Sequence, residues 1–294
     1  MVQGQIAELS RRGVVAVGGP EAETFLDNLL TNNVEGIAGG HAGYGGLLSP
    51  QGKILFDFLV FRDGERFLFD LPRSAVADFV RRLTFYRLRA KVEIADLSDD
   101  HRVIAAWNSP TPPRLDGPVV VDPRLPALGF RAIIPVGSVI IAPEYDTVGE
   151  ADYDAHRLLL GIPEGGMDFA YGDAFPHDAD MDQLGGVAFD KGCYVGQEVV
   201  SRMEHRGTAR RRLIPVRAAS PIPPPGAEIT ADGKPVGTIA SSAGGTGLAM
   251  VRLDRAREAL DAGSTLMVRG MPVEIDLPDW AGFGWPSPRQ AAQD

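Results

Sequence analysis

The sequence predicts an α+β protein that ends in a separate β-rich domain. Strand and helix signals alternate up to residue 160, and only short strands separated by turn residues follow residue 212. With 294 residues, of which 44% are hydrophobic, the chain is long enough for two or three domains with their own cores. The spacing of the last strands is typical of a small β-barrel or β-sandwich.

The N-terminal part combines a hairpin and two helices with a glycine-rich loop. The loop at 39–46 lacks the Gly-Lys-Ser/Thr ending of a phosphate-binding loop. Ser74 is the expected N-cap of the second helix. We expect strands at 13–17, 54–61 and 66–71 and helices at 21–30 and 75–89.

The rest of the chain divides into a crossover, an acid-rich loop and a run of strands. The proline-rich segment 110–126 follows a strand at 103–107 and is expected to connect two substructures. A helix at 152–160 ends at Gly161, and 163–186 is expected to be a long ordered loop of the kind that carries binding residues. Further strands are expected at 213–216, 228–230, 234–241, 248–253, 266–268 and 272–275.

Composition and charge exclude several classes of protein. The net charge of −10 argues against a surface for nucleic acids or anionic membranes, and no apolar stretch is long enough to span a bilayer. One cysteine forms no internal disulfide and supplies no four-thiolate metal site. Because the first residues also lack the pattern of a secretion or import signal, the expected location is the reducing cytoplasm.

The single cysteine, Cys193, lies in an unusual setting. Its neighbours in the run 191–198 (KGCYVGQE) are an ammonium, two glycines, an amide and a carboxylate. Such neighbours favour a thiolate over a buried thiol. The alternative is that Cys193 is a small buried hydrophobic residue.

Charged residues near this run have two interpretations each. The arginines bind carboxylates or phosphates, or else they form salt bridges with the surplus acids; they are Arg202, Arg206, Arg210, Arg211 and Arg212. The acids and the histidine of the loop before these arginines either form a metal site or are solvated turn residues. We favour the second interpretation, so no metal is predicted. These residues are Asp173, His177, Asp178, Asp180 and Asp182. His205 is expected at the surface. Asp57, within the strand 54–61, faces either solvent or a cleft.

The run 191–198, followed by Arg202 and Arg206-Gly207, resembles the signature of the YgfZ family of folate-binding proteins, relatives of the glycine-cleavage T-protein. The likeness extends in the same order through most of the chain. The other similar segments are Arg12-Gly13, Gly18, Phe25-Leu26, Thr31, 48–54, 86–89, Arg157 and 161–164.

The resemblance implies a clover-like arrangement of three parts around a central tetrahydrofolate site. The first part would comprise 1–48 and 116–200, the second 49–115, and the third, a C-terminal β-barrel, 205–294. By resemblance, Cys193 is the functional thiol, Lys191 its cationic neighbour that lowers the pKa of the thiol, and Asp57 a carboxylate facing the pterin. The residues expected to hold the cofactor are Asp57, Tyr194, Gln197, Glu198, Arg202 and Arg206.

The function implied by the resemblance is that of an accessory factor for assembly or repair of iron–sulfur clusters, which supports tRNA-modifying iron–sulfur enzymes indirectly. Its partners would be client enzymes or cluster-assembly proteins, without direct contact to nucleic acid or membrane, and the protein would be a monomer. The alternative is a tetrahydrofolate-dependent aminomethyl or one-carbon transferase, in which Asp57 acts on folate N10 or the substrate amine. The T-protein carries an acid in its Arg-Leu-Glu-Ala-Gly-like run, where this chain has Leu159, and this departure favours the accessory role.

Overall fold

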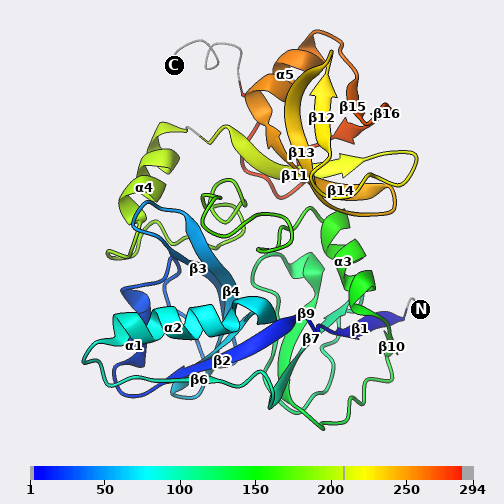
Figure 1. The fold of residues 1–294 in the computed structure, drawn as a ribbon. Coiled ribbons are helices and arrows are strands. Elements are labelled where there is room, and N and C mark those ends of the chain that lie inside the picture. The colour runs from blue at the N-terminus through cyan, green and yellow to red at the C-terminus, as the bar shows by residue number, and fades with distance from the viewer. Residues whose placement is uncertain (1–2, 208, 287–294) are drawn as a thin grey trace. The chain divides into compact units, whose positions relative to one another are not determined.

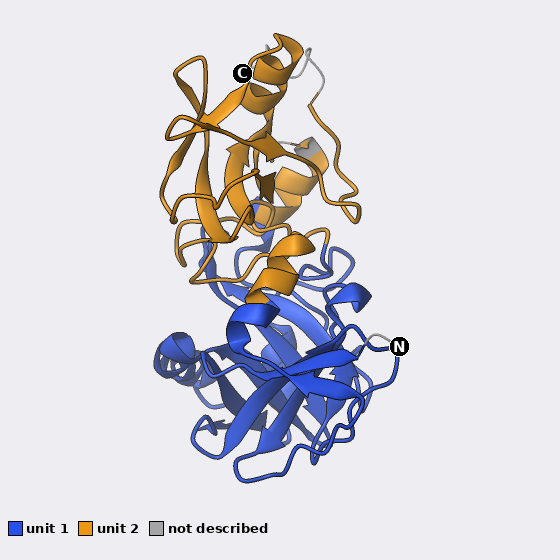
Figure 2. Cartoon of the chain, turned by 90° about the vertical axis from the view of Figure 1, so that its right-hand side faces the viewer, with its two compact units in different colours: residues 1–153, 184–199 blue, residues 154–183, 200–294 orange. Residues whose placement is uncertain are grey.

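The computed structural model describes residues 3–207 and 209–286 and contains two compact units. Unit 1 comprises residues 1–153 and 184–199, and unit 2 comprises residues 154–183 and 200–294 (Figure 2). The division into three parts that the resemblance implies stays a prediction. Helices α3 (Glu150–Leu159) and α4 (Gln197–Arg206) each begin in unit 1 and end in unit 2.

Unit 1 contains two five-stranded sheets (Figure 1). The first has the order β10-β1-β7-β9-β8, in which only β1 and β10 are parallel. The second has the order β3-β4-β5-β2-β6 and is antiparallel throughout. The strands of the first sheet are β1 (Gly4–Glu8), β7 (His101–Trp107), β8 (Val119–Val121), β9 (Phe130–Pro135) and β10 (Tyr145–Thr147). Those of the second are β2 (Arg12–Gly18), β3 (Ala42–Leu48), β4 (Ile54–Asp63), β5 (Arg66–Pro72) and β6 (Glu93–Asp96).

Helix α2 (Val76–Arg87) covers one face of the second sheet through an aromatic cluster. The fully buried ring of Phe79 is centred 5.3 Å from Phe56, 5.4 Å from Phe58 and 5.3 Å from Phe69. Side chains alternate between the faces of a strand, so Phe56 and Phe58 turn Asp57 to the opposite face. The aromatic core therefore decides which face of the sheet can carry polar chemistry.

Unit 2 contains an antiparallel seven-stranded barrel sheet of order β16-β15-β12-β13-β14-β11-β17. Two of its hairpins turn at Asp232-Gly233 and Arg269-Gly270, where all four residues have positive φ, as tight two-residue hairpins require. Its elements are β11 (Arg211–Arg217), β12 (Glu228–Ala231), β13 (Lys234–Ala243), β14 (Thr246–Arg252), α5 (Leu253–Asp261), β15 (Leu266–Val268), β16 (Met271–Pro272) and β17 (Glu274–Ile275). The strands expected between residues 213 and 268 are confirmed, whereas the expected strand 272–275 is divided into β16 and β17, which lie at opposite edges of the sheet.

The fold also corrects several local expectations. The stretch 42–48 is strand β3 rather than loop, because its glycines admit close neighbours: a Cβ on Gly45 would lie 3.0 Å from Asn32 Cβ. Ser74 does not cap α2, which is preceded by the 3₁₀ turn Arg73–Ala75. Strand β8 lies within the expected crossover, followed by the 3₁₀ turn Pro126–Leu128. Helices α1 (Ala22–Asp27) and α3 lie close to their expected positions, whereas α4 and α5 are not predicted from the sequence.

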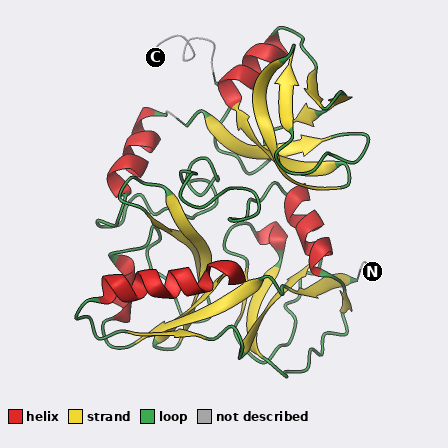
Figure 3. Cartoon of the chain, in the orientation of Figure 1, coloured by secondary structure: helices red, strands yellow, loops and turns green. Residues whose placement is uncertain are grey.

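The long loop expected before the cysteine run is confirmed. Between α3 and α4 the fully described stretch 160–196 contains neither helix nor regular strand, and one isolated bridge pairs Gly165 with Phe169 (Figure 3). This stretch carries the candidate thiol and most of the acids discussed below.

Replacement of Phe79 by Ala should lower the free energy of unfolding of unit 1 by about 3–5 kcal/mol, because it leaves a cavity among three aromatic rings. Urea unfolding followed by circular dichroism measures the change. Phe85, 71% exposed on the same helix, is the matched control, and Phe85→Ala should change the stability by less than about 0.5 kcal/mol. Equal effects of the two changes would contradict this account of the core.

Candidate functional site

Asp57 lies on the buried polar face of the second sheet, opposite α2. It is 3% exposed, so the solvent-facing alternative is wrong. The Tyr44 hydroxyl on β3 donates to Asp57 Oδ2 at 3.4 Å. Burial and the adjacent carboxylate raise the pKa of Tyr44 well above its ordinary value, so this hydroxyl keeps its proton and stays a donor.

A chain of buried ion pairs extends from this face to the first sheet. Arg12 Nε on β2 lies 2.5 Å from Asp70 Oδ1 on β5, and the Arg12 guanidinium also donates to the Asp70 carbonyl oxygen at 2.8 Å. Arg131 on β9 places Nη1 3.4 Å from Asp70 Oδ2. These side chains are at most 8% exposed. They therefore link the two sheets of unit 1 through charges that water does not screen.

The chain continues at the end of β8. Asp122 accepts from Arg124 Nε at 3.0 Å and Nη2 at 2.7 Å, and Arg131 Nη2 lies 3.5 Å from the same carboxylate. The Tyr153 hydroxyl accepts from Arg124 at 3.0 Å and from Arg131 at 2.5 Å. The Arg124 guanidinium also lies 5.9 Å from the centre of the Tyr44 ring. The polar cluster therefore reaches the pair formed by Tyr44 and Asp57.

Lys191 anchors the cysteine loop to the end of helix α1. Its ammonium donates to the carbonyl oxygens of Asp27 at 2.7 Å, Leu30 at 3.0 Å and Asn32 at 2.7 Å, and to Asp27 Oδ1 at 3.0 Å. Burial lowers the pKa of Lys191, while the Asp27 carboxylate opposes that change. Four oxygen acceptors leave the three N–H groups no donor for the thiol. In the structure Lys191 thus has a positioning role, and its predicted effect on Cys193 stays a prediction.

Two glycines bring the cysteine loop against the turn that leads into β4. A Cβ on Gly196 would lie 2.6 Å from the Ser49 carbonyl oxygen, and one on Gly52 would lie 2.9 Å from Val199 Cβ. Both glycines also have positive φ, 84° and 78°. Two segments quoted for the family resemblance, 48–54 and 191–198, therefore pack together, and larger residues at these glycines would separate them.

The other predicted site residues lie on the loop and on α4. Cys193 is exposed, so the alternative of a small buried residue is wrong. Tyr194 is 7% exposed, its hydroxyl has no hydrogen-bond partner among the described residues, and burial raises its pKa to about 12. Gln197 begins α4 and is half-buried, and Glu198 and Arg202 are exposed one helical turn apart. The side chain of Arg206 lies outside the described part of the chain.

Two of the arginines after α4, Arg211 and Arg212, form salt bridges with acids of the preceding loop, which confirms the salt-bridge alternative for these two. Arg212, 4% exposed, donates to both oxygens of Asp182, at 2.6 and 2.9 Å, and to Asp180 Oδ1 at 3.1 Å. Arg211 lies 2.8 Å from Asp178. The expectation of solvated turn carboxylates is wrong for these three acids. They are buried because the arginines of β11 neutralise them.

One group in this region has the composition of a metal site. Ligand atoms of His177, Asp182 and Glu204 lie within 4.8 Å of one another, and His177 Nε2 is 3.1 Å from Glu204 Oε2. Both oxygens of Asp182 already accept from Arg212, whose positive charge opposes a cation at this place. The group is therefore accounted for by hydrogen bonds within unit 2.

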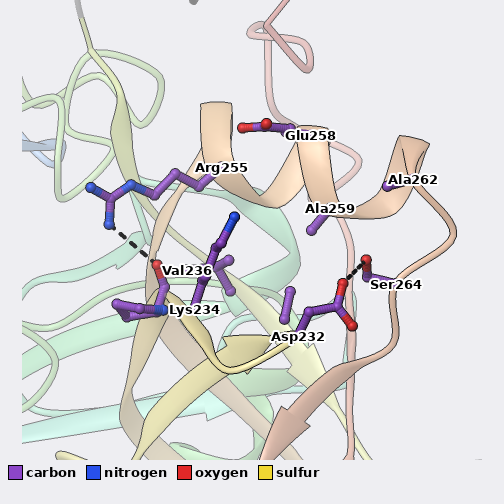
Figure 4. Close-up of a pocket in the computed structure, with 10 residues that line it drawn as sticks. Asp232, Lys234, Val236, Arg255, Glu258, Ala259, Ala262 and Ser264 are labelled. Atoms are coloured by element: carbon purple, nitrogen blue, oxygen red, sulfur yellow. Dashed lines mark hydrogen bonds between the residues drawn. The ribbon is translucent and has the colours of Figure 1, made fainter.

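A surface pocket of about 470 Å³ lies on the barrel, between the β12–β13 hairpin and α5 (Figure 4). Asp232 of the hairpin accepts a hydrogen bond from Ser264 Oγ at 2.5 Å, and Arg255 of α5 donates to the Pro235 carbonyl oxygen at 3.3 Å. None of the residues predicted for the site lines this pocket.

Sequence reasoning missed most of the polar cluster of unit 1. One signal was present: Asp70 is a carboxylate within the apolar strand 66–71, as Asp57 is within 54–61. Tyr44 was placed in a loop because its strand is rich in glycine. Arg12 was quoted for the family resemblance, but Arg124 and Arg131 carry no comparable signal, because a surface arginine and a buried one look alike in a sequence.

Two family matches cover most of the chain. Residues 2–107 match the GCVT N-terminal domain, and residues 210–283 match the C-terminal beta-barrel domain of CAF17. The chain is also similar in fold to the glycine cleavage system aminomethyltransferase T from Bartonella henselae, with a TM-score of 0.74 at 18% identity over 95% of this chain and 87% of that one. The predicted α+β fold with a C-terminal β-barrel is confirmed.

Two relatives in sequence carry the same name. The iron–sulfur cluster assembly factor IBA57 of Homo sapiens is 31% identical over 95% of this chain and 85% of its own length. Its homolog from Mycosarcoma maydis is 30% identical over 88% of this chain and 76% of its own length. Both are named as mitochondrial, which contradicts the predicted cytoplasmic location. A lone cysteine indicates reducing conditions rather than one compartment, so the cysteine argument could not decide this. Separately, none of the described helices combines the length and the apolar character needed to cross a membrane.

Replacement of Lys191 by Met should loosen the cysteine loop, because the methionine keeps the aliphatic stem but leaves carbonyl oxygens of residues 27, 30 and 32 without their donor. Amide hydrogen exchange in residues 188–196 should accelerate about tenfold or more, and unfolding stability should fall by about 1–3 kcal/mol. Lys234→Met is the control, since Lys234 is exposed and forms no ion pair with a described residue. Unchanged exchange in Lys191→Met would exclude the anchoring role.

Proposed function

This chain belongs to the family of iron–sulfur cluster assembly factors named IBA57, and from that premise we propose that it is a tetrahydrofolate-binding accessory protein for assembly or repair of iron–sulfur clusters. Its partners are cluster-assembly proteins or client enzymes. The narrower, YgfZ-like part of the proposal is that tRNA-modifying iron–sulfur enzymes are among those clients and that the effect on tRNA is indirect.

The observation that carries the proposal is an exposed thiol on a loop whose position is fixed by the hydrogen bonds of Lys191. Cys193 is exposed, while Lys191, two residues earlier, is held by four oxygen atoms and Tyr194, the following residue, is buried. A thiolate presented in this way can ligate an iron atom of a cluster that is delivered or received. One thiolate supplies one ligand, so the client or partner must supply the others. The loop would thus act as a contact point for a cluster held jointly.

The polar groups of unit 1 fit the requirements of a bound folate. The Asp57 carboxylate can accept hydrogen bonds from the aminopyrimidine edge, and the neutral Tyr44 hydroxyl, which donates its one proton to Asp57, holds that carboxylate in place. The Tyr194 hydroxyl is buried without a partner among the described residues, which is the state expected of a group that awaits a ligand. We propose Asp57, Tyr194, Gln197 and Glu198 as residues that hold the cofactor, with Arg202 and Arg206 for its glutamate tail. Bound folate would supply a one-carbon carrier.

The transferase alternative has no specific observation in its favour. Leu159, at the place where the T-protein carries an acid, is 57% exposed on α3 and offers no carboxylate. The likeness to aminomethyltransferase T, at 18% identity, concerns the fold alone. Incubation with tetrahydrofolate and aminomethyl donors, with mass detection of methylene-tetrahydrofolate, should therefore give no product.

Replacement of Cys193 by Ala should abolish rescue of iron–sulfur enzyme activity in cells that lack the native protein, because the exposed thiol is the chain's only cysteine sulfur. The same variant should keep its melting temperature and its affinity for tetrahydrofolate, since an exposed side chain adds little to the core. Those two measurements are the controls for folding. Full rescue by Cys193→Ala would remove the thiol from the mechanism.

Replacement of Asp57 by Asn should raise the Kd for tetrahydrofolate about tenfold or more, because a hydrogen bond to a charged acceptor contributes about 1.5–3 kcal/mol. Titration calorimetry under reducing conditions measures it. Asp63→Asn, at the partly exposed end of the same strand, where Asp63 pairs with Arg66, is the matched control and should bind as the native chain does. Native affinity in a folded Asp57→Asn variant would exclude this residue from the folate site.

A further inference from the structure

The C-terminal half of α2 and the residues after it form a cationic patch on an acidic protein. Residues 81–91 include five Lys or Arg and no acid, although the chain carries a net charge of −10. Arg81 pairs with Asp78 at 2.9 Å. Arg82, Arg87 and Arg89 are exposed and form no ion pair with any described residue. Three guanidinium groups are therefore available to carboxylates of another molecule.

Two large apolar side chains lie among these arginines. Phe85 is 71% exposed and Leu88 is 86% exposed. Leu88 ends the helix with φ 46° and ψ −106°, in a positive-φ conformation where glycine is the usual residue. A leucine here is strained by its Cβ and gains no burial within the chain. Stability of the isolated fold therefore does not explain why a leucine occupies this position.

A groove of about 400 Å³ opens beside these side chains, between α1 and the end of α2, and Figure 1 shows the two helices near each other in unit 1. Tyr86 forms part of its wall, and the Phe85 ring is centred 5.7 Å from the Tyr86 ring. The lining is largely apolar: Pro20, Glu21, Thr24, Phe25, Asn28, Leu29, Tyr86 and Ala90. The surface is thus concave at one side, where Glu21 is the one acid of the lining, and Arg87 and Arg89 are sequence neighbours of the lining residues Tyr86 and Ala90.

We propose that this α2 surface, formed by Arg82, Phe85, Arg87, Leu88 and Arg89 with the adjoining groove, docks an acidic segment of a partner protein. An apolar side chain of the segment enters the groove and covers Phe85 and Leu88, and its carboxylates pair with the arginines. Charge complementarity and apolar exposure at one place support this occupant.

Two other occupants fit the surface less well. A bilayer is flat and cannot fill a groove. The chain also has a net charge of −10, so the surface outside this patch is repelled by an anionic membrane. A second copy of the chain in a two-fold contact would place the same arginines opposite each other. The acidic protein segment is the occupant that satisfies both the charge and the shape.

Replacement of Leu88 by Gly separates a docking role from a structural one. Glycine relieves the positive-φ strain, so the melting temperature of the full chain should rise by about 2–3 °C. The same change should weaken docking, because it removes an apolar contact. A leucine that served the fold would instead lower the melting temperature when removed, and that result would overturn the account of Leu88.

Photo-cross-linking identifies the occupant. The full chain with benzoylphenylalanine in place of Phe85 is irradiated in cells, and the cross-linked peptides are sequenced. We expect peptides of another protein with net negative charge and a large apolar residue. Their yield should fall at least fivefold in Leu88→Gly and in Arg87→Glu/Arg89→Glu, but not in Arg114→Glu, which alters an exposed arginine elsewhere in unit 1.

The outcomes that overturn the proposal are equally definite. The proposal is wrong if no cross-link forms, or if the cross-links are to lipid, to a second copy of the chain or to peptides without net negative charge. It is also wrong if the surface variants leave the cross-link yield unchanged. The docking surface does not involve the thiol or the folate site. Cys193→Ala and Asp57→Asn should therefore leave the cross-link yield unchanged, so failure of the docking proposal is distinguishable from failure of the proposed function.

Discussion

The pairing of buried charges between the two sheets of unit 1 is the constraint on which the rest of this unit depends. Three arginines, Arg12, Arg124 and Arg131, and two aspartates, Asp70 and Asp122, are each at most 8% exposed. Removing an ion from water costs several kcal/mol, so these groups are tolerable only while each keeps its partner. A small shift of one sheet against the other would break the pair that joins them, in which Arg131 Nη1 lies 3.4 Å from Asp70 Oδ2. The pairing therefore joins the first sheet to the sheet that carries Asp57 and Tyr44, and Arg124 lies 5.9 Å from the centre of the Tyr44 ring.

The cysteine loop is held in a different way, because the hydrogen bonds of one lysine fix a stretch that has no regular secondary structure. The stretch around Cys193 has no strand or helix to hold it, yet Lys191 binds three carbonyl oxygens at the end of α1 and Gly196 lies against the turn before β4. In the proposed function, an exposed thiol on a fixed loop would lose little conformational freedom on binding an iron atom or a client, because the ordering has already occurred on folding.

Buried arginines also form ion pairs with aspartates in unit 2. Arg157 on α3 lies 2.6 Å from Asp168, and Arg212 on β11 binds Asp180 and Asp182. Burial raises the pKa of Asp180 well above its ordinary value although Arg212 opposes this. Arg157 attaches the loop ahead of the cysteine run to α3, and Arg212 attaches it to barrel strand β11, so a stretch without secondary structure is still ordered. Three of the acids that suggested a metal site, Asp178, Asp180 and Asp182, thus serve as anchors for the loop.

The sequence by itself determined the α+β class, the C-terminal barrel, most of the long strands and the segments whose order matches the family. It could do so because hydrophobic periodicity and turn residues are local signals. Only the tertiary structure decided which charges are buried, because burial of Asp57, Asp178 or Arg212 depends on partners distant in the chain. It also decided that Lys191 donates hydrogen bonds to carbonyl oxygens of residues that lie 159 to 164 positions earlier in the chain. A charged residue next to a thiol in sequence need not act on it, because the donor goes to the acceptors that folding places nearest.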